Sequence, residues 1–360
     1  MSFSQTSFAD NHSKASHFPA HDRPWTSLAF GLAFVFGFLL SIGYSAPLEA
    51  ETTCRLGGGD GPTFESCTPW KSPFKSRAEW LEFMAERISE DETKALEASW
   101  SDEEFNGWVS GSRGSIERVT FPSESLLLRG ILVRPKGEGP FPAVVYARGG
   151  NRQWGRLIFL DVIRMLTMAE AGRVVLALDY RGEGDSEGEP ELGAGDIADV
   201  RSAAAVLQTL PFVDKKQLDV VGFSRGGLVA AWALEAPTPF RSAVLIAGDL
   251  DLVDTANRRP EMDSEVYRLS VPGYAEDRDA ALAAHSPLNA VDRLADVPVL
   301  LLHAADDERV HASASLQFAT HWTQAGRKAR VIVFEDGGHA LLSHFSTVRA
   351  ELESWLRPEK

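Results

Sequence analysis

The sequence has only two cysteines among its 360 residues, Cys54 and Cys67. Their spacing matches no zinc pattern, because no second ligand pair accompanies them, and we expect no metal site. Both lie in a short stretch rich in glycine, serine, threonine and proline. If this stretch is exported we expect them to form a disulfide, whereas in a reducing cytosol they would stay free thiols.

Basic charge is also scarce. The chain carries 36 Lys and Arg against 51 Asp and Glu, which gives a formal net charge of −15. A nucleic-acid-binding protein needs a basic face that displaces counterions from phosphates, so we expect no nucleic acid partner. Hydrophobic residues make up 44% and charged residues 24% of the chain, as in an ordinary globular protein.

Charged residues are absent from residues 26–46, which follow a polar tail at residues 1–25. The length of this apolar run lies between that of a signal-peptide core and that of a membrane-spanning helix. Its Phe and Leu residues would occur all round a helix, which argues against a half-buried helix of a soluble domain. We therefore expect an exported protein, either periplasmic or secreted after cleavage, or anchored in the membrane by the retained segment.

Residues 47–115 predict a linker followed by a helical arm. The first part, up to residue 75, is rich in glycine and proline. Ser76 and Glu79 have the spacing of a capping box, which opens an amphipathic helix, and a second helix is expected from Ser101. This arm is too short for a separate enzyme domain, so we expect its Trp and Phe residues to dock on the main domain.

From residue 116 to residue 360 apolar strands alternate with helical segments, the pattern of a mostly parallel sheet with helices on both faces. Eight strands are expected, and the first two form an antiparallel pair: 115–121, 125–134, 143–147, 174–180, 218–223, 243–247, 299–303 and 329–334. Helices are expected between the strands, including 157–171, 195–210 and 226–235. The chain contains no internal repeat.

The strand at 218–223 runs directly into a G-x-S-x-G turn and then into a helix. Ser224 is the central residue of this turn, and a strained turn of this kind presents the serine hydroxyl. Gly222 and Gly226 remove side chains that would collide with the closely packed chain. The backbone N–H of Arg225 then faces an oxyanion at a helix N-terminus. We predict that Ser224 is a nucleophile.

A nucleophilic serine needs a base that takes its proton and an acid that orients the base. Asp307 lies just past a strand and His339 just past the last strand, in the chain order Ser, acid, His. Asp306 is the second choice for the acid, and a weaker set of alternatives follows another strand: Asp249, Asp251 and Asp254. We interpret His303 as a packed or hydrogen-bonded histidine rather than as a base.

Residues 116–360 resemble the α/β-hydrolase fold, and more specifically the prolyl oligopeptidase (S9) type of serine hydrolase and its dienelactone-hydrolase-like relatives. Five motifs in the right order carry the resemblance: residues 146–152, 179–188, 222–227, 303–310 and 338–339. The acid of this family stands three residues before a valine, which selects Asp307. The β-propeller that precedes the hydrolase domain of prolyl oligopeptidase itself is missing.

The chain departs from the family at two motifs. The usual H-G-G turn after the third strand is Arg148-Gly149-Gly150 here, and the usual H-G before the acid is His303-Ala304. The turn still supplies small residues and backbone N–H groups, so the resemblance assigns the oxyanion hole to this turn together with the N–H of Arg225. Which N–H of residues 148–150 donates stays open.

Residues 254–296 form a charged, helix-prone connection that is longer than an ordinary crossover. Folds of this type place a cap over the substrate pocket here, and we expect a short lid. Arg309, just after the acid, is either a ligand for a substrate carboxylate or backbone or a member of a surface salt bridge.

The motifs together predict a serine hydrolase, an esterase or an S9-like peptidase, that cleaves an ester or amide through a Ser-His-Asp triad and an acyl-enzyme. The expected substrates are small esters, amides or short peptides, and no cofactor is needed. Two alternatives are an acyltransferase and a membrane-anchored hydrolase-fold protein that binds without catalysis.

Overall fold

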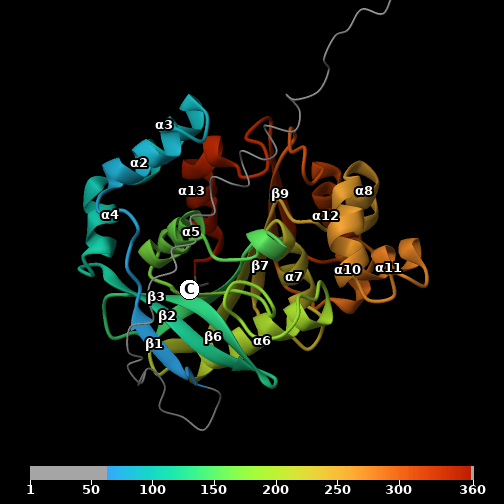
Figure 1. Cartoon of the computed structure of the whole chain (residues 1–360), viewed down its shortest axis with the longest axis horizontal. Helices are drawn as coiled ribbons and strands as arrows, with labels where there is room; N and C mark the ends of the chain where they lie inside the picture. Colours follow the sequence, from blue (N-terminus) through green and yellow to red (C-terminus); the bar gives the residue numbers. More distant parts are fainter. Residues whose placement is uncertain (1–62, 358–360) are drawn as a thin grey trace, which may run out of the picture.

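The computed structural model describes residues 63–357 (Figure 1). The polar tail, the apolar run at 26–46 and Cys54 lie outside these residues. Export, membrane anchoring and the disulfide between Cys54 and Cys67 therefore stay predictions. Within residues 63–357, no helix combines the length and the apolar composition that crossing a bilayer requires.

The fold is built on one nine-stranded sheet. Its strands in chain order are β1 (Ser66–Pro69), β2 (Gly114–Ser123), β3 (Leu126–Pro135), β4 (Phe141–Ala147), β5 (Val174–Leu178), β6 (Val213–Phe223), β7 (Ser242–Ile246), β8 (Val299–Ala304) and β9 (Ala329–Phe334). Their spatial order is β1-β2-β3-β5-β4-β6-β7-β8-β9. The pairs between β5 and β9 are parallel, and the three pairs from β1 to β5 are antiparallel. The mostly parallel sheet is thus confirmed.

The prediction of eight strands was wrong by one, because β1 lies in the stretch that was expected to be a linker. Its four residues pair antiparallel with the outer edge of β2. The Ser66 hydroxyl donates to Thr120 Oγ1 at 3.0 Å, and the ring of Phe64 packs edge-on against Phe121. So short a strand has no readable alternation of its own, and contacts with β2 decide its conformation.

Helices cover both faces of the sheet (Figure 1). The longer ones are α2 (Arg77–Ala85), α3 (Glu90–Ser99), α4 (Asp102–Val109), α5 (Phe159–Glu170), α6 (Ala194–Thr209), α7 (Arg225–Ala233), α8 (Leu252–Arg258), α11 (Arg278–His285), α12 (Ala312–Gln324) and α13 (Phe345–Trp355). Short helical turns complete the set: η1 (Arg152–Trp154), α9 (Pro260–Met262), η2 (Asp263–Tyr267), α10 (Arg268–Ser270), η3 (Pro287–Asn289), η4 (Val291–Arg293) and η5 (Leu342–His344).

Successive side chains of the central strands point to opposite faces and fill two separate hydrophobic cores. On β4, Val145 belongs to the core under α6, α7 and α12, whereas Val144 and Tyr146 belong to the core under α5 and α13. The central strands are buried on both faces, which explains why they read as continuous apolar runs.

The arm of helices α2 to α4 docks on the core under α5 and α13, as predicted from its aromatic residues. Trp80 is 1% exposed, stacks on Phe105 at 5.7 Å between ring centroids and meets Phe159 of α5 edge-on. Helix α3 was missed in the sequence, although Ser89 and Glu92 form a full capping box at its start. At α2, Ser76 accepts from the Glu79 N–H, but the Glu79 side chain accepts from Lys75 N.

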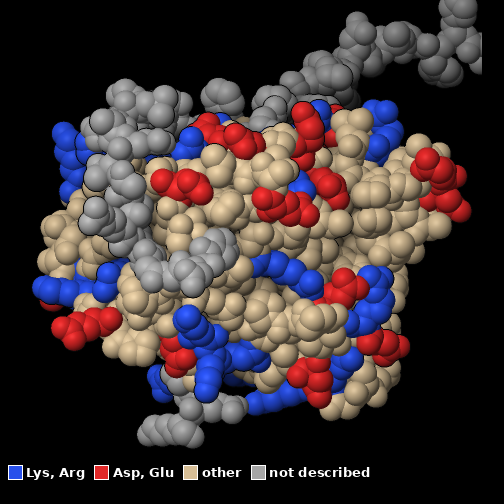
Figure 2. Space-filling model, turned by 90° about the horizontal axis from the view of Figure 1, so that it is seen from below, with Lys and Arg blue, Asp and Glu red and all other residues tan. Residues whose placement is uncertain are grey.

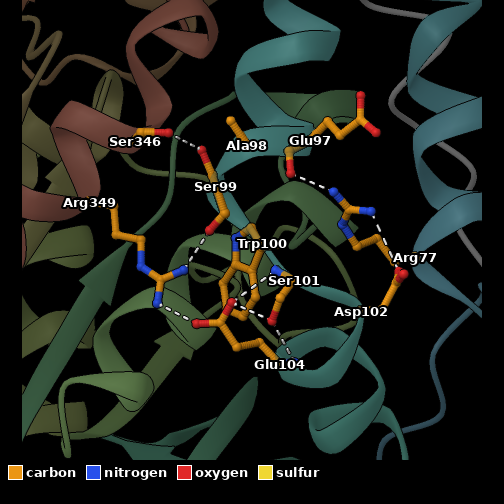
Figure 3. Close-up of a pocket in the computed structure, with 10 residues that line it drawn as sticks. All are labelled: Arg77, Glu97, Ala98, Ser99, Trp100, Ser101, Asp102, Glu104, Ser346 and Arg349. Atoms are coloured by element: carbon orange, nitrogen blue, oxygen red, sulfur yellow. Dashed lines mark hydrogen bonds and ion pairs between the residues drawn. The ribbon is translucent and has the colours of Figure 1, made fainter.

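A cleft of about 570 Å³ lies at the seam between the arm and α13 (Figure 3). Arg349 of α13 donates across the seam to Glu104 and to the carbonyl of Ser99. Within the arm, Arg77 Nη1 lies 3.5 Å from Asp102 Oδ1. The Arg349 guanidinium also lies over the ring of Trp100. None of the residues predicted for the active site lines this cleft.

The connection predicted as a lid lies between β7 and β8 and contains helices α8 to α11 and the three short turns η2, η3 and η4. Tyr267 and Leu282 in this segment are fully buried against the first core. Arg152, in the turn after β4, donates to the carbonyl of Glu265 at 2.6 Å. The segment therefore touches a turn near Ser224, and its role as a lid stays a prediction.

Both signs of charge are exposed on the face drawn in Figure 2. Acidic side chains dominate the upper edge of this view, and basic side chains are concentrated in its middle and lower part. The two signs of charge are therefore unevenly distributed over this face.

We predict that Trp80→Ala destabilises the protein by about 3–5 kcal/mol, because it removes a buried ring that joins α2, α4 and α5. Leu269→Ala is the control, since Leu269 is 55% exposed and its loss should change stability by less than about 0.5 kcal/mol. The free energy of unfolding in urea measures both. Equal stability of Trp80→Ala and wild type would mean that the arm does not support the fold.

Candidate active site

The predicted turn at Ser224 has the strained geometry that its sequence indicates. Strand β6 ends at Phe223, Ser224 has φ 57° and ψ −122°, and α7 begins at Arg225. A Cβ on Gly222 would lie 2.0 Å from the Gly226 carbonyl oxygen, and a Cβ on Gly226 would lie 1.9 Å from the Ala147 carbonyl oxygen. Only glycine fits at either position, so the turn requires both residues.

The structure brings Ser224, His339 and Asp307 into one hydrogen-bonded chain. His339 Nε2 lies 2.8 Å from Ser224 Oγ, and His339 Nδ1 lies 2.8 Å from Asp307 Oδ2. Because an ionised carboxylate only accepts hydrogen bonds, Nδ1 carries the proton of a neutral imidazole, and Nε2 accepts from the serine hydroxyl. The other oxygen of Asp307 accepts from the backbone N–H groups of Arg309 and Val310 at 2.8 and 3.0 Å.

The loop geometry explains how these groups meet. Asp307 follows β8 and His339 follows β9, and these parallel strands end at the same edge of the sheet as β6. Gly337 and Gly338 both have positive φ and form the turn that carries His339. Asp306, the second choice for the acid, instead accepts from the Gly338 N–H at 2.8 Å. Asp306 thereby supports the histidine loop.

The other acids considered in the sequence are engaged elsewhere. Asp249 is buried and accepts from Thr255 and Tyr267. Asp251 caps the start of α8, and Asp254 pairs with Arg258 on the same helix.

The surroundings of His339 favour its neutral form at neutral pH, and those of Asp307 favour its ionised form. Burial lowers the pKa of His339 below its ordinary value of 6.5, although the hydrogen bond and the charge of Asp307 oppose this. Burial alone would raise the pKa of Asp307, but hydrogen bonds from His303, His339 and the Val310 N–H outweigh it and hold this pKa well below its usual range. The result is a neutral imidazole beside an ionised carboxylate.

The predicted oxyanion turn lies directly against the serine. A Cβ on Gly149 would lie 3.0 Å from Ser224 Cβ, so the turn and the nucleophile are in contact. The Arg148 side chain donates to the Gly149 carbonyl at 2.9 Å, and the Arg225 side chain donates to the Gly150 carbonyl at 3.2 Å. In a trans peptide the N–H points away from the C=O, so the N–H groups of Gly150 and Asn151 point away from these guanidinium groups.

Residues 160–357 match the prolyl oligopeptidase family. The chain belongs to this family. An uncharacterized peptidase of Bacillus subtilis, YtmA, is 29% identical over 193 residues, which cover 53% of this chain and 73% of that protein. The family membership and the sheet order confirm the resemblance noted in the motifs and identify a hydrolase of the peptidase and esterase type.

Solved structures show the same α/β-hydrolase fold. The acylaminoacyl peptidase of Pyrococcus horikoshii has a TM-score of 0.58 at 21% identity over 68% of this chain, but only 42% of that chain is covered. The Pyrococcus furiosus esterase PF2001 has a TM-score of 0.51 at 20% identity, with 66% of this chain and 87% of the esterase covered. The matched part of this prolyl oligopeptidase family member therefore covers less than half of the peptidase chain and most of the esterase chain.

A buried ionic network lies beneath the turn that carries Ser224, and most of this network was not predicted from the sequence. Glu183 is 3% exposed and accepts from Arg148 at 2.9 Å, from Arg225 at 2.8 Å and from the Arg152 N–H at 2.7 Å. Asp196 accepts from two nitrogens of Arg225. The sequence signal for this network was the Gly-rich acidic loop at residues 179–188. Its second carboxylate, Glu183, was not assigned a partner from the sequence.

The same network surrounds an aromatic ring. The guanidinium carbons of Arg148 and Arg225 lie 4.8 and 4.7 Å from the ring centroid of Tyr180, and the Tyr180 hydroxyl donates to the Arg148 carbonyl. Asp179 accepts from Arg148 at 3.1 Å and from the Leu157 N–H, so it also belongs to this network. The Arg148 side chain is fully buried and hydrogen-bonded here, so it is unable to reach an oxyanion.

Arg309 lies on the same loop as Asp307 and is exposed. Among the residues that the structure describes, its guanidinium forms no ion pair, and burial of part of the group together with the nearby charge of Arg259 lowers its pKa. Arg259 pairs with Glu261 at 2.8 Å. Arg259 and Arg309, from different loops, thus lie within electrostatic range of each other, and Arg309 also lies within electrostatic range of His339.

We predict that Glu183→Gln destabilises the protein by about 3–5 kcal/mol at pH 7, because two buried guanidinium groups lose their shared counter-charge. Burial opposes ionisation, but Arg225 and Arg148 hold the pKa of Glu183 below its ordinary value of 4.5. The ionised carboxylate therefore stabilises the protein above pH 4.5, and this contribution is lost as the pH falls through the lower folded pKa.

The free energy of unfolding of wild type and variant should thus differ most near neutral pH and converge in acid. Glu90→Gln is the control, because Glu90 is 82% exposed and its pair with Lys94 on α3 is worth less than about 1 kcal/mol. Equal destabilisation by both substitutions at pH 7 would show that the buried network does not hold the turn.

Proposed function

We propose that this protein is a serine hydrolase in which Ser224 attacks an ester or amide carbonyl and forms an acyl-enzyme. The observation that carries the proposal is the chain of two 2.8 Å hydrogen bonds from Ser224 through His339 to Asp307, with the serine on a strained turn. The membership in a family of peptidases agrees with it.

The first half of the reaction uses the neutral histidine. His339 Nε2 takes the proton of the serine hydroxyl as Oγ bonds to the carbonyl carbon, and Asp307 stabilises the resulting imidazolium through Nδ1. The imidazolium then gives its proton to the leaving alcohol or amine as the acyl–oxygen or acyl–nitrogen bond breaks. The acyl group stays on Ser224 Oγ.

The second half repeats these steps with water. His339 takes a proton from water as the water oxygen attacks the acyl carbon, and returns a proton to Ser224 Oγ when the acyl–enzyme bond breaks. The acid is released and the enzyme is restored. Transfer of the acyl group to another acceptor uses the same steps, so an acyltransferase activity would depend on what reaches this site.

The oxyanion of each tetrahedral intermediate needs preorganised donors. We assign the Arg225 N–H, which lies at the first position of α7 and has no acceptor within the helix. The second donor is the N–H of Gly150, because the Gly149 carbonyl of that peptide is held by Arg148 and its N–H points the other way. The side chains of Arg148 and Arg225 thus orient the oxyanion hole by holding the backbone carbonyls of Gly149 and Gly150.

The substrate has an ester or amide bond, and the covered relatives include both a peptidase and an esterase. Arg309 is our candidate ligand for a carboxylate or a backbone carbonyl of the substrate, because it is an exposed residue whose partly buried guanidinium forms no ion pair within the described residues. The segment at residues 254–296 is our candidate lid. Paired ester and amide substrates with the same acyl group distinguish an esterase from a peptidase.

A fluorophosphonate probe should label the wild type and fail to label Ser224→Ala, because the probe bonds only to an activated serine. Ser264→Ala is the matched control, since Ser264 is exposed on the predicted lid and its loss should leave labelling unchanged. Labelling is read by gel fluorescence and intact mass. Equal labelling of Ser224→Ala and wild type would contradict the assignment, and a wild type without labelling or turnover would support a binding protein.

The pH dependence of kcat/KM on a p-nitrophenyl ester follows from the state of His339. Protonated His339 is unable to accept the serine proton, so the rate should rise with pH as the imidazolium of the free enzyme loses its proton. Burial lowers the pKa of His339, so the midpoint of this rise should lie below 6.5. A midpoint at or above 6.5 would mean that the environment of the base differs from the one described.

A further inference from the structure

We propose that His303 is a positioning residue for the acid of the triad: it holds the Asp307 carboxylate from the side opposite His339, directly and through the backbone of Val310. This inference rests on the proposed function of Ser224, His339 and Asp307. It assigns to His303 a task in the reaction rather than a task in packing alone.

His303 stands near the end of β8 and is fully buried. Its Nε2 lies 2.9 Å from the Val310 carbonyl oxygen and 3.2 Å from Asp307 Oδ2. The same Oδ2 accepts from His339 Nδ1 at 2.8 Å. Two imidazole rings therefore converge on one carboxylate oxygen.

The partners of His303 fix its tautomer. The Val310 carbonyl oxygen only accepts, so Nε2 of His303 carries a proton and donates. Nδ1 lies 2.8 Å from the hydroxyl of Ser315, which is fully buried on α12. In the neutral ring Nδ1 is the acceptor, and the Ser315 hydroxyl donates to it. The positive end of the Nε2–H bond therefore faces both the carbonyl and the carboxylate.

Val310 connects the acid loop to His303 through its two backbone groups. The Val310 N–H donates to Asp307 Oδ1 at 3.0 Å, while the Val310 carbonyl accepts from His303. The chain Ser315–His303–Val310 thus holds the carbonyl of Val310, the same residue whose N–H donates to one carboxylate oxygen, and the His303 N–H lies beside the other oxygen. With both oxygens held, Asp307 is fixed in the orientation in which Oδ2 meets His339.

This arrangement predicts a particular defect when the donor is removed. In His303→Leu, Asp307 keeps its partner His339 but loses the donor beside Oδ2 and the anchor of Val310. We expect kcat to fall about 10- to 100-fold, the range for a lost hydrogen bond to a charged group, with a smaller change in KM. His303→Gln keeps an N–H donor near the position of Nε2 and should restore most of kcat.

The charged and titratable groups that face His339 are Asp307, Arg309 and His303. Asp307 raises the pKa of His339, whereas Arg309 and His303 lower it. Without the His303 donor the carboxylate charge acts on His339 alone, so the acidic limb of kcat/KM should move to higher pH in His303→Leu and return toward wild type in His303→Gln. A residue that only packs would not move this limb.

The test measures kcat, KM and the pH profile of kcat/KM on a p-nitrophenyl ester for wild type, His303→Leu, His303→Gln and the exposed control His311→Leu. The inference is overturned if the Leu and Gln variants of His303 lose kcat equally and keep the wild-type limb. An active wild type with this result leaves the proposed function standing, whereas an inactive, unlabelled wild type removes the proposed function itself.

A second measurement needs no variant to fold. In wild-type protein with ¹⁵N-labelled histidine, the NMR shifts of His303 should report Nε2 as the nitrogen that carries the proton and Nδ1 as the acceptor. A ring protonated at Nδ1 alone would place no donor beside Asp307 and would overturn the inference.

Discussion

The close approach of the α7 backbone to the end of β4 is the constraint on which the rest of the site depends. At Gly226 any side chain would enter the Ala147 carbonyl, and at Gly222 it would enter the Gly226 carbonyl. These two contacts set the strained backbone of Ser224 and bring the turn of Gly149 against the serine. The nucleophile and its oxyanion turn are thus two parts of one backbone contact.

Buried ion pairs beneath the turn stabilise this backbone contact. Arg148 and Arg225 donate to the carbonyls of Gly149 and Gly150, so their guanidinium groups orient the turn through the backbone. Two such groups are costly to bury unless carboxylates pair with them, and Glu183 and Asp196 do so. A family position that usually carries a histidine therefore carries Arg148 here together with the acids that it needs.

The sequence predicted the parts whose chemistry is local. The G-x-S-x-G turn and the alternation of strands follow from short-range patterns. Ser224, Asp307 and His339 were each predicted from their place at the end of a strand, and the structure brings their side chains within hydrogen-bond distance. Strand β1 and the partners of Glu183 were not predicted, because they depend on contacts between segments far apart in the chain. Helix α3 was missed although its capping box was readable, since Leu96 is the one large apolar residue in it.

The hydrogen-bond partners of His303 likewise depend on contacts between segments far apart in the chain. Its place beside the acid was visible in the sequence, and a packed or hydrogen-bonded histidine was expected. Which groups it bonds depends on the way α12 returns Ser315 to the end of β8, and only the folded structure provides this.

The central claim is that an acyl group passes through Ser224 Oγ. Rapid acid quench during turnover of an activated ester, followed by peptide mapping by mass spectrometry, measures it directly. If Ser224 is the nucleophile, the acyl mass appears on the peptide that contains Ser224 and disappears as product forms. An acyl group on another residue, or steady turnover without any acylated peptide, would contradict it.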